Sequence, residues 1–337
     1  MPLCLLGHTL GIQMVFPVIH STLDPKALMQ EIEERYALQG KVRCQLMSRA
    51  NNDFYEVTAA GARFALRVAK ANFRTTDEYL FEAQYVSHLK AEGCLVPAPV
   101  PAQDGSYFFE VEAPDGTRAI TLMNWLDGKP FNEKLSNNDA AKMGAALASL
   151  HNAGESFKSQ STRSISTVDI LNERMPDLYA LLEADSEHQK FYRDATEKVV
   201  AEYANLDPKS LRYGPVHGDF QFANVMRTGD GAIAVLDFDT CGTGLYAEDL
   251  YTFIWRSDME IRSESVNQAF VEGYQGVRPL NAEELNGGPL FRVARDLVMS
   301  STYAILINRV GPVPGFDGDF QPFTQLARQH LQYAELD

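Results

Sequence analysis

Three polar side chains stand at fixed spacing in residues 216–239, VHGDFQFANVMRTGDGAIAVLDFD, and together they could carry out phosphoryl transfer. Asn224 follows Asp219 by five positions, and Asp237 follows it by eighteen. The run AIAVL before Asp237 is apolar and partly β-branched, which predicts a buried strand that ends at this carboxylate. Transfer of phosphate from a nucleotide needs one carboxylate to orient a hydroxyl, and an amide and a second carboxylate to hold a divalent metal.

The segments HGDFQFAN and LDFD resemble the catalytic and metal-binding loops of the aminoglycoside phosphotransferase, choline kinase and homoserine kinase type II group. The resemblance implies a two-lobed α+β protein-kinase-like fold, with a small antiparallel-sheet lobe carrying one main helix and a larger, mainly helical C-terminal lobe. It also implies that Asp219 is the catalytic base, that Asn224 and Asp237 bind Mg²⁺, and that ATP or another NTP is the donor. Alternatively, each of these three residues could simply cap a helix in a solvated loop. That would explain each residue singly, but not the presence of all three at this spacing.

Three neighbouring residues are expected to support this stretch. Asp239 would hold a second metal or support the first, and capping of backbone amides is an equal alternative. The resemblance implies that Asp249, in the segment AEDL, braces the backbone of the catalytic loop, although it could also be a simple charge at a helix N-terminus. His217 is expected to be mainly a packing residue of the loop.

A cation for the phosphates is expected on the strand RFALRV, residues 63–68. Alternation along the strand places Ala65 and Arg67 on one face and the apolar residues on the other. The resemblance aligns Ala65 with a small residue that faces adenine, and Arg67 with a lysine that binds phosphate. The alternative for Arg67 is an ordinary arginine on the surface. The resemblance also implies that Glu82, in a helix predicted over 77–89, pairs with this cation, and Glu78 is a rival one turn earlier.

Two further segments would meet the nucleotide if the resemblance holds. The turn SRANNDFYEV contains no glycine, but Ser48 and Asn52 could still offer backbone N–H groups to phosphates. An ordinary hairpin turn is equally compatible with this segment. The backbone around Met123–Trp125 would bind adenine, and Trp125 would pack either on a ligand or between the lobes.

Bulk composition limits the remaining possibilities. At 337 residues and 45% hydrophobic content, the chain is expected to fold into two lobes. We expect an N-terminal extension at 1–22, a nucleotide-binding lobe at 23–123 and a catalytic and substrate-binding lobe at 124–337. The net charge of −15 disfavours nucleic acid and anionic membranes as partners. Four scattered cysteines, no membrane span and no clear leader predict a reduced, cytoplasmic protein.

Glycine, serine and proline mark the connections. Gly242–Gly244 predicts a flexible turn, the Ser-rich stretch 154–167 predicts a mobile loop, and Pro176 predicts a helix boundary or kink.

These observations favour a kinase whose acceptor is a hydroxyl of a small molecule such as an amino alcohol, amino acid or amino sugar. A protein Ser/Thr kinase of the bacterial stress-response type and a nucleotide-binding pseudokinase scaffold are the alternatives. The sequence leaves the oligomeric state open, as monomer or homodimer.

Overall fold

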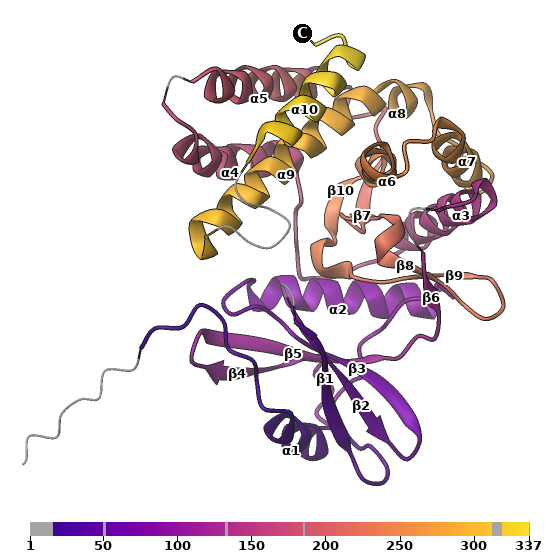
Figure 1. The fold of residues 1–337 in the computed structure, drawn as a ribbon. Coiled ribbons are helices and arrows are strands. Elements are labelled where there is room, and N and C mark those ends of the chain that lie inside the picture. The colour runs from indigo at the N-terminus through magenta and orange to yellow at the C-terminus, as the bar shows by residue number, and fades with distance from the viewer. Residues whose placement is uncertain (1–15, 50–51, 132–133, 185, 312–318, 337) are drawn as a thin grey trace, which may run out of the picture.

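The chain forms two lobes of different size, which Figure 1 shows one below the other. The computed structural model describes residues 16–49, 52–131, 134–184, 186–311 and 319–336. A five-stranded sheet with two helices forms the small lobe, and the large lobe is mainly helical with two small sheets. The predicted two-lobed α+β architecture is therefore confirmed, whereas the limits 23–123 and 124–337 stay a prediction.

The small-lobe sheet is antiparallel, with strand order β1-β2-β3-β5-β4. One face packs on α1 (Pro25–Arg35), whose Leu28 and Ile32 join the apolar core of the sheet. The Asp24 carboxylate caps α1, and the proline that follows starts it. The strands are β1 (Arg43–Arg49), β2 (Asp53–Ala59), β3 (Ala62–Val68), β4 (Phe109–Ala113) and β5 (Gly116–Asn124).

Helix α2 (Thr76–Ala91) runs between the sheet and the large lobe (Figure 1). A capping box starts it, because the Thr75 and Glu78 side chains each bind the backbone N–H of the other residue. Glu78 is thereby engaged at the helix start, while Glu82 reaches β3. Tyr85 and its apolar neighbours on the helix pack into the core of the large lobe, so α2 connects the two lobes.

Two groups of helices build the large lobe, each around its own apolar core. One core joins α2 with α3, α6, α7, β8 and β9, and the other joins α4, α5, α9 and α10. Helix α4 continues through Pro176, so the expected boundary there is wrong. The elements are β6 (Lys129–Pro130), α3 (Asn137–Gly154), α4 (Thr167–Leu181), α5 (Glu187–Asn205), β7 (Tyr213–Val216), β8 (Val225–Arg227), β9 (Ile233–Val235), β10 (Gly242–Leu245), α6 (Tyr246–Glu260), α7 (Glu264–Gln275), α8 (Ala282–Asn286), α9 (Gly288–Val310) and α10 (Gln321–Tyr333).

The segment Gly242–Gly244 lies in a strand, not in the flexible turn that its glycines predicted. It belongs to β10, which pairs antiparallel with β7, Gly242 opposite Val216. A Cβ atom on Gly242 would lie 2.6 Å from a methyl carbon of Ile165. The glycine is therefore explained by close packing of the chain rather than by flexibility.

The Ser-rich stretch 154–167, expected to be a mobile loop, is bonded to its neighbours. Ile165 N–H donates to the Thr243 carbonyl at 3.1 Å, and Thr243 N–H donates to the Arg163 carbonyl at 2.7 Å. The backbone N–H that precedes Arg163 donates to Asp77 in the first turn of α2. These bonds tie the start of α2 to the large lobe.

Part of the predicted N-terminal extension packs on the small lobe. The His20 imidazole lies 3.1 Å from the buried carboxylate of Asp53, and Ser21 N–H donates to Asp115 at 3.2 Å. Asp53 also pairs with the fully buried Arg118 at 3.2 Å. Residues 16–22 are the described part of that extension, and residues 1–15 lie outside the described residues.

Helices α3 and α7 approach each other closely at two glycines. A Cβ atom on Gly144 would lie 1.9 Å from the Phe270 carbonyl oxygen, and one on Gly273 would lie 2.0 Å from the Ala141 carbonyl oxygen. Backbone atoms cannot move aside without shifting a helix, so these two positions require glycine.

The substitution Gly144→Ala should lower the free energy of unfolding by about 1–3 kcal/mol, because the added methyl overpacks the contact between α3 and α7. Urea denaturation followed by circular dichroism measures this change. Gly276→Ala, at the end of α7, is the matched control, since its Cβ atom would meet nothing closer than 3.5 Å. Equal stability of the two variants would show that the helices do not pack as described.

Candidate active site

One carboxylate of α6 holds two backbone amides of the loop that follows β7. Asp249 accepts hydrogen bonds from the N–H groups of His217 at 2.7 Å and Gly218 at 2.8 Å. The His151 imidazole lies 3.2 Å from the same carboxylate. Burial alone would raise the pKa of Asp249, but its hydrogen bond to His151 and the bond from the loop backbone lower it. The geometry agrees with the bracing role expected for Asp249.

His217 connects this loop to the strand that leads to Asp237. Its Nδ1 accepts the Asp219 N–H at 3.3 Å, so Nε2 carries the proton and donates to the Leu236 carbonyl at 2.8 Å. The buried ring also packs on Phe238, with 4.6 Å between ring centroids. The ring therefore packs on Phe238, and its two hydrogen bonds link the segments of Asp219 and Asp237; that packing is the main role of His217 stays a prediction.

Three side chains hold the carboxylate of Asp219. Asn224 Nδ2 and Gln221 Nε2 donate to Oδ2 at 3.0 and 2.9 Å. Arg295, which reaches in from α9, donates to Oδ1 and also to the Gly218 carbonyl at 3.2 Å. The carboxylate therefore has a fixed orientation and a positively charged neighbour.

The pairing of β8 with β9 brings Asn224 close to Asp237. Leu236 N–H, one residue before Asp237, donates to the Asn224 carbonyl at 2.8 Å. The side-chain nitrogen of Asn224 donates to both the backbone and the side chain of Asp219, at 2.9 and 3.0 Å. Its side-chain oxygen is therefore the atom left for a cation.

Asp237 occupies a strained position at the end of β9. Its backbone is left-handed, with φ of 60°, a conformation uncommon outside glycine that often marks functional sites. The residue as a whole is exposed to water, but the protein that packs around its carboxylate partly desolvates that group. Burial, followed by the charge of Asp239, raises the pKa of Asp237. A divalent cation would offset that repulsion.

The donor set at this site fits Mg²⁺ that is shared with a nucleotide. Within the described residues, no group of three His, Cys, Asp or Glu side chains could hold a metal by itself. Asn224 and Asp237 offer one amide oxygen and one carboxylate. Mg²⁺ is usually bound by one or two carboxylates, waters and substrate phosphates, so a sparse protein set is what such a site requires.

A buried carboxylate of α2 joins two arginines below the site. Glu82 accepts from Arg67 at 2.6 Å and from Arg74 at 2.8 Å, and Arg74 also pairs with Asp239 at 2.6 Å. None of these four side chains is more than 13% exposed. Burial alone would lower the pKa of Arg67, but Glu82 and then Asp239 raise it. The network joins the small lobe to the segment that follows Asp237.

The expected adenine-binding segment is firmly held. Met123 pairs with Ala65 across β5 and β3, which places both predicted residues next to each other. Asn124 binds the Ala98 carbonyl through both its backbone and its side chain, each at 2.9 Å. Trp125 lies under the guanidinium of Arg63, 3.8 Å from the ring centroid.

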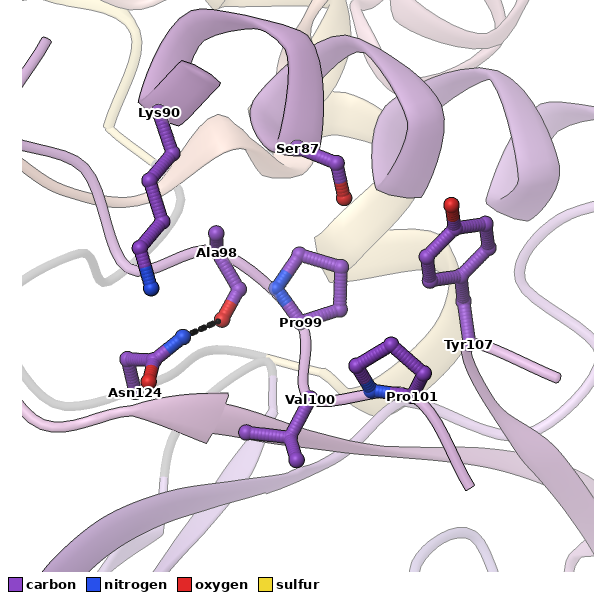
Figure 2. A pocket seen from close by; sticks show the side chains of 8 residues that line it. All are labelled: Ser87, Lys90, Ala98, Pro99, Val100, Pro101, Tyr107 and Asn124. Carbon is purple, nitrogen blue, oxygen red and sulfur yellow. Dashed lines mark hydrogen bonds between the residues drawn. The ribbon is translucent and has the colours of Figure 1, made fainter. Parts of the chain in front are cut away.

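A cavity of about 360 Å³ borders this segment on the small lobe. Figure 2 shows its lining, in which Lys90 and Ser87 of α2 face the segment 98–101, and the dashed line marks the bond from Asn124 to Ala98.

Ser48 and Asn52, the two residues predicted to contact phosphates in the first hairpin, lie in different environments. Ser48 is exposed beside an irregularity in the pairing of β1 with β2. Asn52 is buried, and its side-chain oxygen accepts the Lys70 N–H at 3.3 Å. Asn51, between them, lies outside the described residues, so a phosphate-binding role of this turn stays a prediction.

The motifs and strand patterns of the sequence identified neither Arg74 nor Gln221, nor the contact of Arg295 with Asp219. Arg74 stands in an irregular segment before α2, where no pattern assigns a direction to its side chain. Arg295 lies 76 positions after Asp219. Only the folded chain brings α9 to the catalytic loop.

A second cavity, of about 700 Å³, opens next to Asp219. It lies between the two groups of helices, and α4, α6 and α9 provide most of its wall. Arg74 and Asp239 reach it from the side of the lobe interface. A small molecule bound there would have access to Asp219.

Comparisons with known proteins show the family and the fold. The profile of the "Phosphotransferase enzyme family" matches residues 44–284. A homoserine kinase of Agrobacterium fabrum (strain C58) is 29% identical over 210 residues, which make up 61% of this chain and 62% of that kinase.

Two solved structures share the fold over most of their length. The microcompartment-associated aminopropanol kinase has a TM-score of 0.72 at 23% identity, over 93% of this chain and 99% of that one. The amicoumacin kinase hAmiN, solved with AMP-PNP, Ca²⁺ and Ami, has a TM-score of 0.73 at 18% identity, over 93% of both chains. At these identities the likeness is one of fold, and it confirms the kinase-like architecture. The profile match covers most of the chain, and the protein therefore belongs to the phosphotransferase enzyme family.

Proposed function

We propose that the protein transfers the γ-phosphate of ATP, or of another NTP, to a hydroxyl group of a small molecule. The observation that carries this proposal is the position of Asp219. Its carboxylate is oriented by Asn224 and Gln221, stands in a loop braced by Asp249, and borders a cavity of about 700 Å³. Membership of the phosphotransferase family supports the same reaction type.

In the proposed mechanism Asp219 orients the acceptor hydroxyl and takes its proton as the new bond to phosphorus forms. The remaining task is positioning and neutralisation of charge, since phosphoryl transfer needs little covalent chemistry from a protein. Arg295 holds the Asp219 carboxylate in this orientation through its contact with Oδ1. The braced backbone at His217 and Gly218 then limits the movement of the loop.

Asn224 and Asp237 would hold Mg²⁺, which supplies positive charge to the phosphates. From the small lobe, Arg67 would contact the phosphates as well. Within the described residues its buried Nε–H has no hydrogen-bond partner, while the bond to Glu82 fixes the orientation of its guanidinium. Arg74 shares the same carboxylate and holds Asp239, so we propose a supporting role for Asp239 rather than a second metal.

The homoserine and aminopropanol kinases among the similar proteins support an acceptor that carries an amino group. Within the described residues no helix is long and apolar enough to cross a membrane. The thiols of Cys44, Cys94 and Cys241 are free, which is compatible with the expected reducing cytoplasm. A protein acceptor and a pseudokinase remain the alternatives to a small-molecule kinase, and turnover assays separate them.

Asp219→Asn should lower turnover by about 10²–10⁴-fold and leave nucleotide affinity nearly unchanged, because the amide cannot accept the proton. Asp237→Ala should instead weaken nucleotide binding in the presence of Mg²⁺ and have little effect in EDTA. Steady-state assays and calorimetry with a non-hydrolysable ATP analogue measure both effects. Native turnover by Asp219→Asn would exclude this residue as the base.

Arg67→Ala should lower turnover by about 10²-fold, because a misplaced phosphate loses the alignment on which the rate depends. Arg67→Lys should recover only part of the loss, since lysine lacks the planar fork. Glu82→Gln should give a milder defect by loosening both Arg67 and Arg74. Arg43→Ala, at an exposed position on β1, is the control and should keep native kinetics. If Arg67→Ala also kept native kinetics, Lys70 would be the cation to test.

A further inference from the structure

One wall of the cavity beside Asp219 is mainly apolar, and it carries the carboxylate of Glu248, whose surroundings differ from those of the other charged groups. Val298, Met299 and Leu306 of α9 and Ile170 of α4 provide apolar surface. Glu248 of α6 lies on the same wall, directly before the bracing residue Asp249. The acceptor of the proposed reaction must bind in this space, because its hydroxyl has to reach Asp219.

Most charged groups on the wall already have a charged partner. Arg295 pairs with Asp219, and Arg256 pairs with Glu260. Arg74 and Asp239 pair with each other, and Asp249 is bound by His151 and two amides. These contacts leave those groups little capacity to recognise a further charge.

Glu248 differs from these groups, because no ion pair joins it to a cation in the described part of the chain. The Tyr203 hydroxyl donates to its Oε1 at 2.7 Å, and Thr167 lies beside it as a second neutral donor. Arg295 is the cation that acts on it from α9, but that guanidinium binds Asp219. Burial raises the pKa of Glu248 despite its hydrogen bonds with Thr167 and Tyr203.

A carboxylate in such a place favours a cationic ligand. Charge-assisted hydrogen bonds inside a protein are stronger than neutral ones, and a buried charge gains most from a partner of opposite sign. The apolar wall alone would accept the carbon skeleton of many alcohols, with weak discrimination. Discrimination between them requires a polar group in a defined position, and Glu248 is such a group.

We infer that Glu248 binds the ammonium group of the acceptor, so that the enzyme selects hydroxyl compounds with a primary or secondary amine. This inference rests on the proposed function and names the substrate class of its cavity. Glu248 would anchor one end of the acceptor while Asp219 binds the hydroxyl at the other. Tyr203 would keep the carboxylate turned toward the cavity.

The test measures phosphorylation of matched compounds that differ in the amine. Suitable pairs are 1-amino-2-propanol and 2-butanol, L-homoserine and 4-hydroxybutanoate, and glucosamine and glucose. The wild-type enzyme should favour the amine in the pair that contains its best acceptor. Glu248→Gln should lower kcat/KM for that amine by about 30-fold or more, mainly through KM, and should change turnover of the amine-free compound by less than about threefold.

Three further variants make the result specific. Tyr203→Phe should give a smaller loss than Glu248→Gln, again restricted to the amine. Glu264→Gln, exposed in the first turn of α7 and outside the cavity lining, should leave all kinetics unchanged. Glu173→Gln tests an exposed carboxylate of the cavity wall that, like Glu248, has no ion pair within the described residues. A loss with Glu173→Gln as large as that with Glu248→Gln would overturn the assignment to Glu248.

The remaining outcomes separate this inference from the proposed function. A preference for amine-free alcohols, or equal losses on both members of a pair, would overturn the inference and leave phosphotransfer intact. Absence of turnover with every compound would contradict the proposed small-molecule activity itself, and the inference with it. Circular dichroism of Glu248→Gln confirms that the variant is folded.

Discussion

The ion pairs around Glu82 are the contacts on which the relation between the two lobes depends. A buried carboxylate is unfavourable unless it is paired, and Glu82 obtains its partners from two different segments of the small lobe, Arg67 on β3 and Arg74 before α2. Arg74 then binds Asp239 of the large lobe. Removing any one member would take one of its partners from a buried charge. The network therefore favours one arrangement of β3, α2 and the segment after Asp237.

Within the large lobe a second carboxylate, that of Asp249, fixes the position of the catalytic loop. Asp249 holds the backbone after β7, and His217 extends that constraint to the end of β9 through its imidazole. The two loops that carry Asp219 and Asp237 are thus fixed by hydrogen bonds to buried groups before any ligand binds. Such preorganisation is the main contribution that a protein makes to phosphoryl transfer. It also explains why polar residues that do not touch a substrate are buried here.

The sequence predicted those parts of the site that lie on one regular element or within one motif. Strand alternation placed Arg67 and Ala65 on one face, and the family resemblance implied Glu82 as the partner of Arg67. Glu78 could be set aside only when its capping box was seen, because both carboxylates fit the helical period. Arg74 and Arg295 were beyond such reasoning, since their roles depend on an irregular segment and on a contact between distant parts of the chain.

The glycines of β10 show a second reason why the sequence alone did not predict the local structure. Gly242 and Gly244 predicted a turn, because glycine is common where the backbone must bend. Here they allow Ile165 to lie against the strand, a reason that appears only when the neighbour across the contact is known. The Ser-rich stretch was likewise interpreted as mobile from composition alone, although its backbone pairs with β10. In both segments, packing against neighbouring residues determined the structure, rather than the local amino-acid composition.

The central claim is that both lobes enclose one nucleotide–metal complex at Asn224 and Asp237. A crystal structure of the protein with Mn²⁺ and a non-hydrolysable ATP analogue, with the anomalous signal of manganese recorded, tests this claim most directly. The account predicts a manganese peak bound by the side-chain oxygen of Asn224, the carboxylate of Asp237 and the phosphates, with the Arg67 guanidinium within hydrogen-bond distance of a phosphate oxygen. A metal peak away from Asn224 and Asp237, or a nucleotide bound outside the interface of the lobes, would contradict it.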